Sequence, residues 1–168
     1  MLKRQFLMGL ALAIAAATPA WAEGYMDVAA LAKTLPEASV PLEQGIKASE
    51  PQGMPISAKF EIENGTLQLS VYTMNRDQFS EVIVDHKKGS VDKSEAITSG
   101  DDLRAAGEQG AAMSKAKQPL GRAVQAALDA NAGYRAVSAT PSLDAGHPVA
   151  TVVLMKGQDV KKVTQKLD

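Results

Sequence analysis

The 168-residue chain carries 18 basic and 19 acidic side chains and no cysteine. This balance argues against a nucleic-acid-binding protein, which normally presents a clustered basic face. The lack of cysteine excludes disulfides, thiolate metal ligands and a cysteine nucleophile.

The N-terminus has the pattern of a secretory signal. A positive segment, Lys3–Arg4, precedes the apolar run 6–17, and a small-x-small pattern ends at Ala22. We expect residues 1–22 to be a signal peptide that is cleaved after Ala22, so that the mature protein is periplasmic or secreted. A membrane anchor is the less favoured alternative, because Pro19 interrupts the apolar run before it reaches spanning length. The mature chain keeps 16 basic and 19 acidic side chains, a net charge of −3.

Two short helices are expected, each beginning after a proline. Pro41 and Pro119 stand where a helix tolerates proline best. Beyond each of them, apolar or small residues recur at the spacing i, i+3, i+4 and i+7, which predicts one buried helix face. The two predicted faces consist of Leu42, Gly45, Ile46 and Ser49, and of Leu120, Ala123, Val124 and Ala127.

A β-hairpin is predicted around Asn64-Gly65, the strongest short signal for a two-residue hairpin turn. Such a turn sets Glu63 opposite Thr66 and thereby fixes the register of both strands. Apolar residues then face apolar residues, as a buried sheet face requires. The predicted pairs are Ile62 with Leu67, Phe60 with Leu69, and Ala58 with Val71.

Further strands are expected on both sides of the middle of the chain. Residues 80–85 form a third strand, and a short return strand follows around Val91. Pro141 is expected to mark an edge strand or the end of one, because proline cannot donate to a central ladder. The nearly continuous apolar run 149–155 predicts an interior strand. The strands predicted in the second half are 134–140, 149–155 and 160–166.

The order of elements occurs twice, which predicts an α+β fold with two related units. Each unit is a helix packed on a three- to four-stranded antiparallel sheet, and the units span residues 23–99 and 100–168. A connecting helix, beginning near Asp101, opens the second unit and is expected to bury little. A mobile linker is the alternative, since Gly107 and Gly110 each weaken a helix by about 1 kcal/mol.

The third strand of the first unit ends in a sequence that resembles a family motif. Val84, Asp85, Gly89 and Val91 match the V-D-x-x-[TK]-G-x-V-like turn of the PepSY domain family. In such a turn the Asp85 side chain caps the backbone and Gly89 adopts the left-handed conformation. The resemblance covers about residues 40–97, whereas the second unit lacks this turn.

The resemblance implies a binding or regulatory role. PepSY-type modules occur in propeptides of thermolysin-type metallopeptidases, where they are associated with inhibition, and in exported proteins of undefined role. This chain has no H-E-x-x-H motif, so an inhibitory role would act in trans. We expect no catalytic residue, metal or cofactor, and an unknown protein partner, of which a peptidase is one candidate. The expected contact strands, which would accept an extended segment at a sheet edge, carry Val82, Ile83, Val84, Val160 and Val163.

Other chemistry has little support in the sequence. His86 and His147 are the only histidines and fall in different predicted turns, so we interpret them as ordinary polar residues rather than metal ligands. No G-x-S-x-G motif or phosphate-binding glycine loop occurs. Two further hypotheses stay open: a small-ligand or metal-ion carrier that uses a cleft between the units, and a structural envelope protein.

Overall fold

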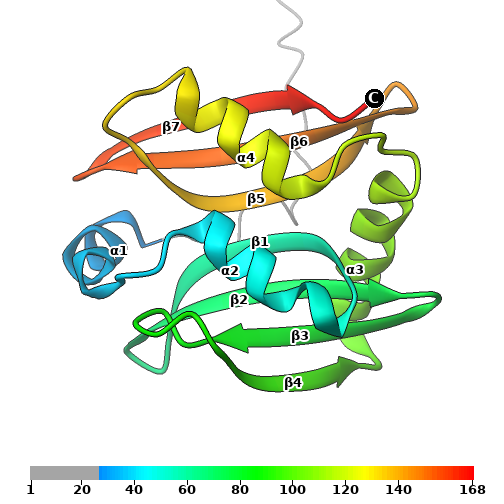
Figure 1. Ribbon diagram of the computed structural model, residues 1–168, viewed down its shortest axis with the longest axis horizontal. Helices are drawn as coiled ribbons and strands as arrows, with labels where there is room; N and C mark the ends of the chain where they lie inside the picture. Colours follow the sequence, from blue (N-terminus) through cyan, green and yellow to red (C-terminus); the bar gives the residue numbers. More distant parts are fainter. Residues whose placement is uncertain (1–26) are drawn as a thin grey trace, which may run out of the picture.

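Seven strands form one antiparallel sheet in the order β4-β3-β2-β1-β5-β6-β7 (Figure 1). The computed structural model describes residues 27–168, and the predicted signal peptide lies outside the described residues. The strands are β1 (Met54–Glu63), β2 (Thr66–Asn75), β3 (Gln78–Val84), β4 (Val91–Ile97), β5 (Arg135–Asp144), β6 (His147–Lys156) and β7 (Asp159–Lys166).

The helices cover both faces of this sheet. They are α1 (Val28–Thr34), α2 (Leu42–Ser49), α3 (Gly100–Met113) and α4 (Leu120–Asp129), with 3-10 turns η1 (Leu35–Glu37) and η2 (Glu50–Gln52). Figure 1 shows α2 and α4 side by side in front of the strands, on what we call the front face. Helix α3 packs on Met74 and Phe79, whose side chains point to the opposite, back face.

The predicted hairpin is confirmed residue by residue. In β1 and β2, Glu63 pairs with Thr66, and the three predicted apolar pairs follow in the same register. Asn64 and Gly65 have φ values of 50° and 78°, the positive values that a type I′ turn requires.

The two predicted helix faces are also confirmed, since all eight of their residues are buried. Gly45 shows how closely α2 approaches the sheet. A Cβ atom on Gly45 would lie 2.5 Å from Leu69 Cδ2, and Leu69 is fully buried in β2. The spacing of small and apolar residues therefore predicted both which side of the helix is buried and where the backbone must come close.

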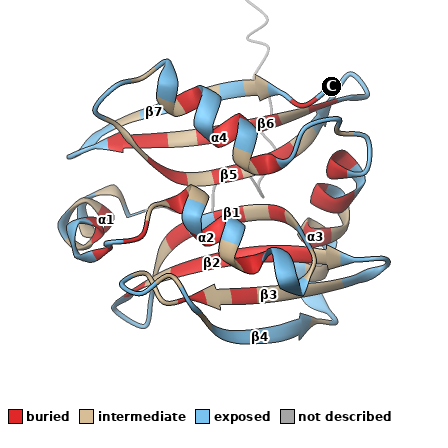
Figure 2. Ribbon diagram, viewed as in Figure 1, coloured by how far each residue is buried: buried red, intermediate tan, exposed pale blue. Residues whose placement is uncertain are grey.

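The expectation that the connecting helix buries little is wrong. Helix α3 forms, and it buries Ala106, Gln109, Gly110, Ala112 and Met113 (Figure 2). Its small residues are what allow the helix to approach the back face of the sheet. A composition rich in Ala and Gly was therefore a sign of close packing and not of a linker.

The prediction for Pro141 is wrong as well. Pro141 is buried inside β5, an interior strand, and pairs with Ala150 of β6. It is tolerated because the ladder between β5 and β1 comprises only Ala139 with Ala58 and Ser138 with Lys59, and thus ends before Pro141. The prediction that the run 149–155 is interior is confirmed, because β6 pairs with both β5 and β7.

The α+β class with antiparallel strands is confirmed, and the strands of both halves join in one sheet rather than in a separate sheet for each half. The pairing of β1 with β5 makes the junction. Buried apolar residues from both halves belong to one core cluster. The two ends of the sheet, β4 and β7, are left as its edges.

Candidate interaction site at the sheet edges

The structure contradicts one of the two predicted contact strands, β3. Val82, Ile83 and Val84 lie in β3, which pairs with β2 on one side and β4 on the other. Their backbone groups already serve these two ladders, and the side chains of Val82 and Val84 are buried. An extended partner segment therefore has no access to β3. The prediction was wrong because it placed β3, the last strongly apolar strand of the first half, at the edge of the sheet. The weakly apolar strand β4 pairs with β3 on that side and forms the edge instead.

The other predicted contact strand, β7, is an edge. Val160 and Val163 are half-buried in it, and among the described strands only β6 pairs with it. In an edge strand every second residue turns its N–H and C=O groups away from the sheet, where they can bond another strand. The exposed side chains along this edge include Lys161, Lys162 and Lys166, against the single acidic residue Asp159. The β7 edge is therefore positively charged.

Contacts at both ends hold β7 in place. At its start, the hydroxyl of Tyr134 donates to Asp159, and Lys161 Nζ lies 4.4 Å from the centroid of the Tyr134 ring. Beyond its end, Leu167 is fully buried, and its carbonyl accepts hydrogen bonds from the backbone N–H groups of Lys117 and Gln118. A strand held in this way loses little conformational freedom when it binds, which favours pairing with an extended segment.

The family-like turn has the predicted geometry. Asp85 Oδ1 accepts hydrogen bonds from the backbone N–H groups of Lys87 (2.8 Å) and Lys88 (3.0 Å), and Gly89 has a φ of 78°. These hydrogen bonds hold the pKa of the Asp85 carboxyl below its ordinary value. Val84 is buried and Val91 is half-buried beside it in the β3–β4 pair.

This turn lies against the N-terminal end of α2. The backbone N–H of Val40 donates to the carbonyl of His86 (2.9 Å), and a Cβ atom on Gly89 would lie 2.8 Å from Gln44 Nε2. The motif residues therefore shape a turn that is anchored to the N-terminal end of α2.

The two histidines lie in different parts of the fold. His86 is in the turn between β3 and β4, and its Nδ1 is buried without a hydrogen-bond partner among the described residues. His147 begins β6 and lies 3.0 Å from the carboxylate of Asp168. Within residues 27–168, no group of three or more His, Cys, Asp or Glu side chains is placed to hold a metal ion.

Two polar arrangements were not foreseen from the sequence. Arg135, at the start of β5, donates from its guanidinium to the carbonyls of Leu35 (3.0 Å) and Ala38 (3.1 Å), and burial lowers its pKa. The hydroxyl of Tyr72 on the back face donates to Asp102 in the first turn of α3 (3.0 Å), and burial together with this carboxylate raises the pKa of Tyr72. Sequence spacing carried no signal for either contact, because the partners are 97 and 30 residues apart.

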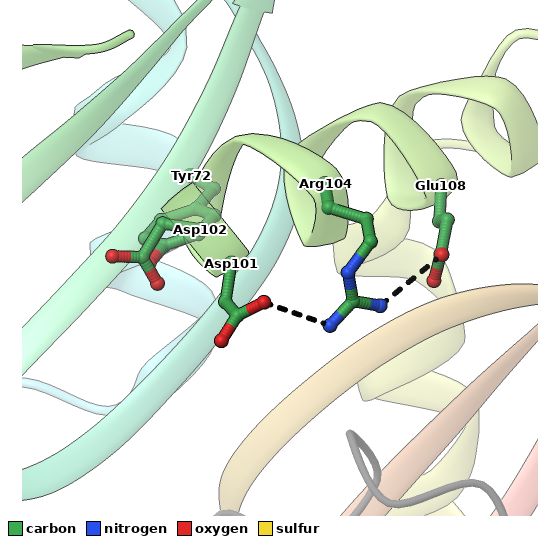
Figure 3. A network of polar contacts seen from close by, with 5 residues as sticks. All are labelled: Tyr72, Asp101, Asp102, Arg104 and Glu108. Carbon is green, nitrogen blue, oxygen red and sulfur yellow. Dashed lines mark hydrogen bonds and ion pairs between the residues drawn. The ribbon is translucent and has the colours of Figure 1, made fainter. Parts of the chain in front are cut away.

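The arrangement around α3 extends along its exposed side (Figure 3). Arg104 lies between Asp101 (3.2 Å) and Glu108 (3.4 Å), one helical turn away on either side. Such exposed pairs stabilise a helix slightly. A hollow at the β2–β3 turn is lined by the turn residues Arg76 and Asp77 and by the strand ends beside them, Asn75 and Gln78, and not by residues at the β1–β5 junction.

Comparison with known proteins assigns no family. No family model matches the chain, and no curated protein matches it. A crystal structure of a putative lipoprotein from Clostridium difficile 630 is similar, at 11% identity and a TM-score of 0.44, over 78% of this chain and 88% of that one. Among the described residues, no helix is long and apolar enough to cross a membrane.

Proposed function

We propose that this chain is an exported, non-catalytic binding protein that pairs an extended segment of a partner protein with β7. The observation that carries the proposal is that β7 is an edge strand anchored at both ends. It carries the half-buried Val160 and Val163 and a row of exposed lysines. Backbone hydrogen bonds to such an edge supply affinity, and the side chains that flank it supply specificity. The lysines favour an acidic segment, because opposite charges on neighbouring strands stabilise the pairing.

The two halves of the chain support the proposal as related units of a PepSY-like protein. In each half a helix on the front face, α2 or α4, directly precedes the strands or, in the first half, the short turn η2 before them, and the buried positions of the two helices correspond in spacing. Each helix leads into antiparallel strands, and the first strands of the halves, β1 and β5, pair with each other. The PepSY resemblance makes an envelope peptidase the first class of partner to test.

A charge-reversal experiment tests this function. The mature protein, residues 23–168, is added at micromolar concentration to exported peptidases of its host, and binding and residual activity are measured. The double variant Lys162→Glu/Lys166→Glu reverses the charge of the β7 edge and is expected to weaken binding at least about tenfold. The matched control Lys33→Glu/Lys47→Glu changes the net charge equally at exposed positions of α1 and α2 and is expected to bind as the wild type does.

The outcomes separate the parts of the proposal. If no peptidase is bound and no peptidase activity is reduced, peptidases are the wrong class of partner. The protein is then used to capture its partner from an extract of the host cell envelope. If a captured partner binds the β7 variant and the wild type equally well, the assignment of the β7 edge is wrong.

A further inference from the structure

The opposite edge of the sheet, β4, has a sequence that complements itself. Its central residues, Asp92 to Ala96, are all exposed, and among the described strands only β3 pairs with it. Figure 2 shows β4 as an exposed strand along the border of the sheet. The ladder with β3 skips Asp92, which has no partner between the pairs Ile83–Lys93 and Val84–Val91. The regularly paired part of β4 that is open to a further strand therefore begins at Lys93.

A second copy of this segment fits beside the first in antiparallel register. When Ser94 is set opposite Ser94 of the second copy, Lys93 of each copy faces Glu95 of the other. The twofold axis is perpendicular to the sheet, so the back faces of both copies stay on the same side, as a continuous sheet requires. Both cross-strand charge pairs are then of opposite sign, which stabilises antiparallel pairing.

The neighbouring strand supplies an independent reason for this pairing. Glu95 is directly opposite Glu81 of β3, and two like charges in this position destabilise a sheet. Among residues 27–168 of one chain, Glu95 is paired only with Lys93 on its own strand, at 2.8 Å, and both of these side chains are more than half exposed. Lys93 of a second copy would place a further cation beside the two carboxylates.

The β7 edge lacks this property over a comparable length, because copies centred on Val160 set Asp159 opposite Lys161 but overlap by only three strand residues. Centring two antiparallel copies on Lys162 sets lysine against lysine, and centring them on Val163 gathers the lysines of both strands with only two aspartates to balance them. The two edges of the sheet therefore differ, and β4 is the one that matches itself.

We propose that two copies of the protein associate through β4 about a twofold axis at Ser94, and that their sheets become one. This interface goes beyond the proposed function, because it uses the edge opposite β7. It leaves both β7 edges free at the two ends of the joined sheet.

Charge reversal tests the register. Sedimentation velocity over a concentration series from about 1 µM to 1 mM is expected to show a monomer–dimer equilibrium. Lys93→Glu and Glu95→Lys, made separately, set like charges opposite each other and are each expected to raise the dissociation constant at least about tenfold. A mixture of the two variants is expected to form mixed dimers, and the double swap Lys93→Glu/Glu95→Lys is expected to dimerise again. Circular dichroism and thermal unfolding confirm that each variant is folded.

A cysteine introduced at the axis tests the geometry. Because the chain has no cysteine of its own, Ser94→Cys can form a disulfide only with a second copy. Cα atoms directly opposite in an antiparallel pair are about 4.5 to 5.5 Å apart, within reach of a disulfide. Oxidation is expected to yield a covalent dimer of Ser94→Cys and little of it for Thr164→Cys, an exposed control position on β7.

Three results would overturn the proposal. The wild type could remain a monomer at every concentration, which would mean that Lys93 serves only to keep the edge from pairing. The single charge reversals could leave the dimer unchanged. The mass could instead grow beyond a dimer, which would indicate that β4 of one copy pairs with β7 of another.

Discussion

Arg135 is a residue whose long side chain joins two distant parts of the chain. It begins β5, and its guanidinium donates to carbonyls at both ends of η1, those of Leu35 and Ala38. A planar guanidinium reaches two acceptors at once, whereas a lysine ammonium on a flexible chain presents a single point of charge. The segment that precedes α2 is therefore held to the second half of the sheet by one side chain.

Replacing Arg135 with lysine is expected to lower the free energy of unfolding by about 1 to 2 kcal/mol, because hydrogen bonds from a charged donor to half-buried carbonyls are lost. Urea denaturation measures the loss, and hydrogen exchange is expected to rise over residues 28–40. Arg122→Lys, at an exposed position of α4, is the matched control and should change neither. Equal effects of the two substitutions would contradict the role given to Arg135.

Asp85 makes the stability of the turn depend on pH. Its carboxylate accepts two backbone hydrogen bonds, and its pKa in the folded protein is lowered. A lowered pKa means that the carboxylate stabilises the fold above the pKa of the unfolded chain, about 4, and that this contribution is lost as the pH falls through the lower, folded value.

Asp85→Asn is therefore expected to lower the melting temperature by a few degrees at pH 7, and the difference from the wild type should shrink as the pH is lowered toward 2. Thermal unfolding followed by circular dichroism over this pH range tests the expectation. Asp144→Asn, at the exposed end of β5 next to the β5–β6 turn, serves as the control. A difference between Asp85→Asn and the wild type that stays constant with pH would show that the carboxylate charge is not the cause.

At the scale of elements, α3 shows how two glycines in one helix can have different roles. A Cβ atom on Gly110 would lie 2.9 Å from both Met74 Sδ and Phe79 Cε1, whereas a Cβ atom on Gly107 would have no neighbour within 4 Å. Gly110 is thus the point of close approach between α3 and the back face. Gly107 lies on the open side and only weakens the helix.

The two substitutions to alanine are expected to act in opposite directions. Gly110→Ala forces Met74 and Phe79 to move and should cost about 1 to 3 kcal/mol. Gly107→Ala meets no atom and should stabilise the protein by up to about 1 kcal/mol through helix propensity. Chemical denaturation of both variants measures the contrast, and a stabilising Gly110→Ala would show that α3 packs less closely than described.

At the scale of the whole molecule, the halves share one core although their sheets meet through a short ladder. The β1–β5 pairing comprises two residue pairs. The core cluster nevertheless runs from Leu31 in α1 to Leu167 at the C-terminal end, and α2 contacts α4 across the junction. Neither half can keep its buried surface covered without the other.

The protein is therefore expected to unfold in one cooperative transition. Tyr72 lies in the first half and Tyr134 in the second. In a chain that also carries Tyr25→Phe, the variants Tyr72→Phe and Tyr134→Phe therefore allow tyrosine fluorescence to follow the second half and the first half, respectively. The transitions from both variants and from far-UV circular dichroism should each have a single step, and in each variant the two probes should coincide. Two separated transitions would mean that the halves are independent folding units.

Local contacts explain which parts of the fold could be predicted. The helix faces at Leu42 and Leu120 and the register around Asn64-Gly65 were correct because they depend on spacing within a few residues. The Asp85–Gly89 turn followed from the same kind of local geometry. By contrast, the burial of Gly110 depends on its contacts with Met74 and Phe79, and Pro141 is tolerated only because the β1–β5 ladder ends before it.

The sequence by itself determined the order of the strands and the buried sides of α2, α4 and the β1–β2 hairpin. Only the tertiary structure decided which strands lie at the edges of the sheet. It shows that β3 is interior and that β7 and β4 are the edges at which another strand could pair. The physical reason is that an alternating pattern specifies the face of a strand but not its neighbours. That choice depends on pairing between segments such as Ala58 and Ala139, which come together only when the whole core forms.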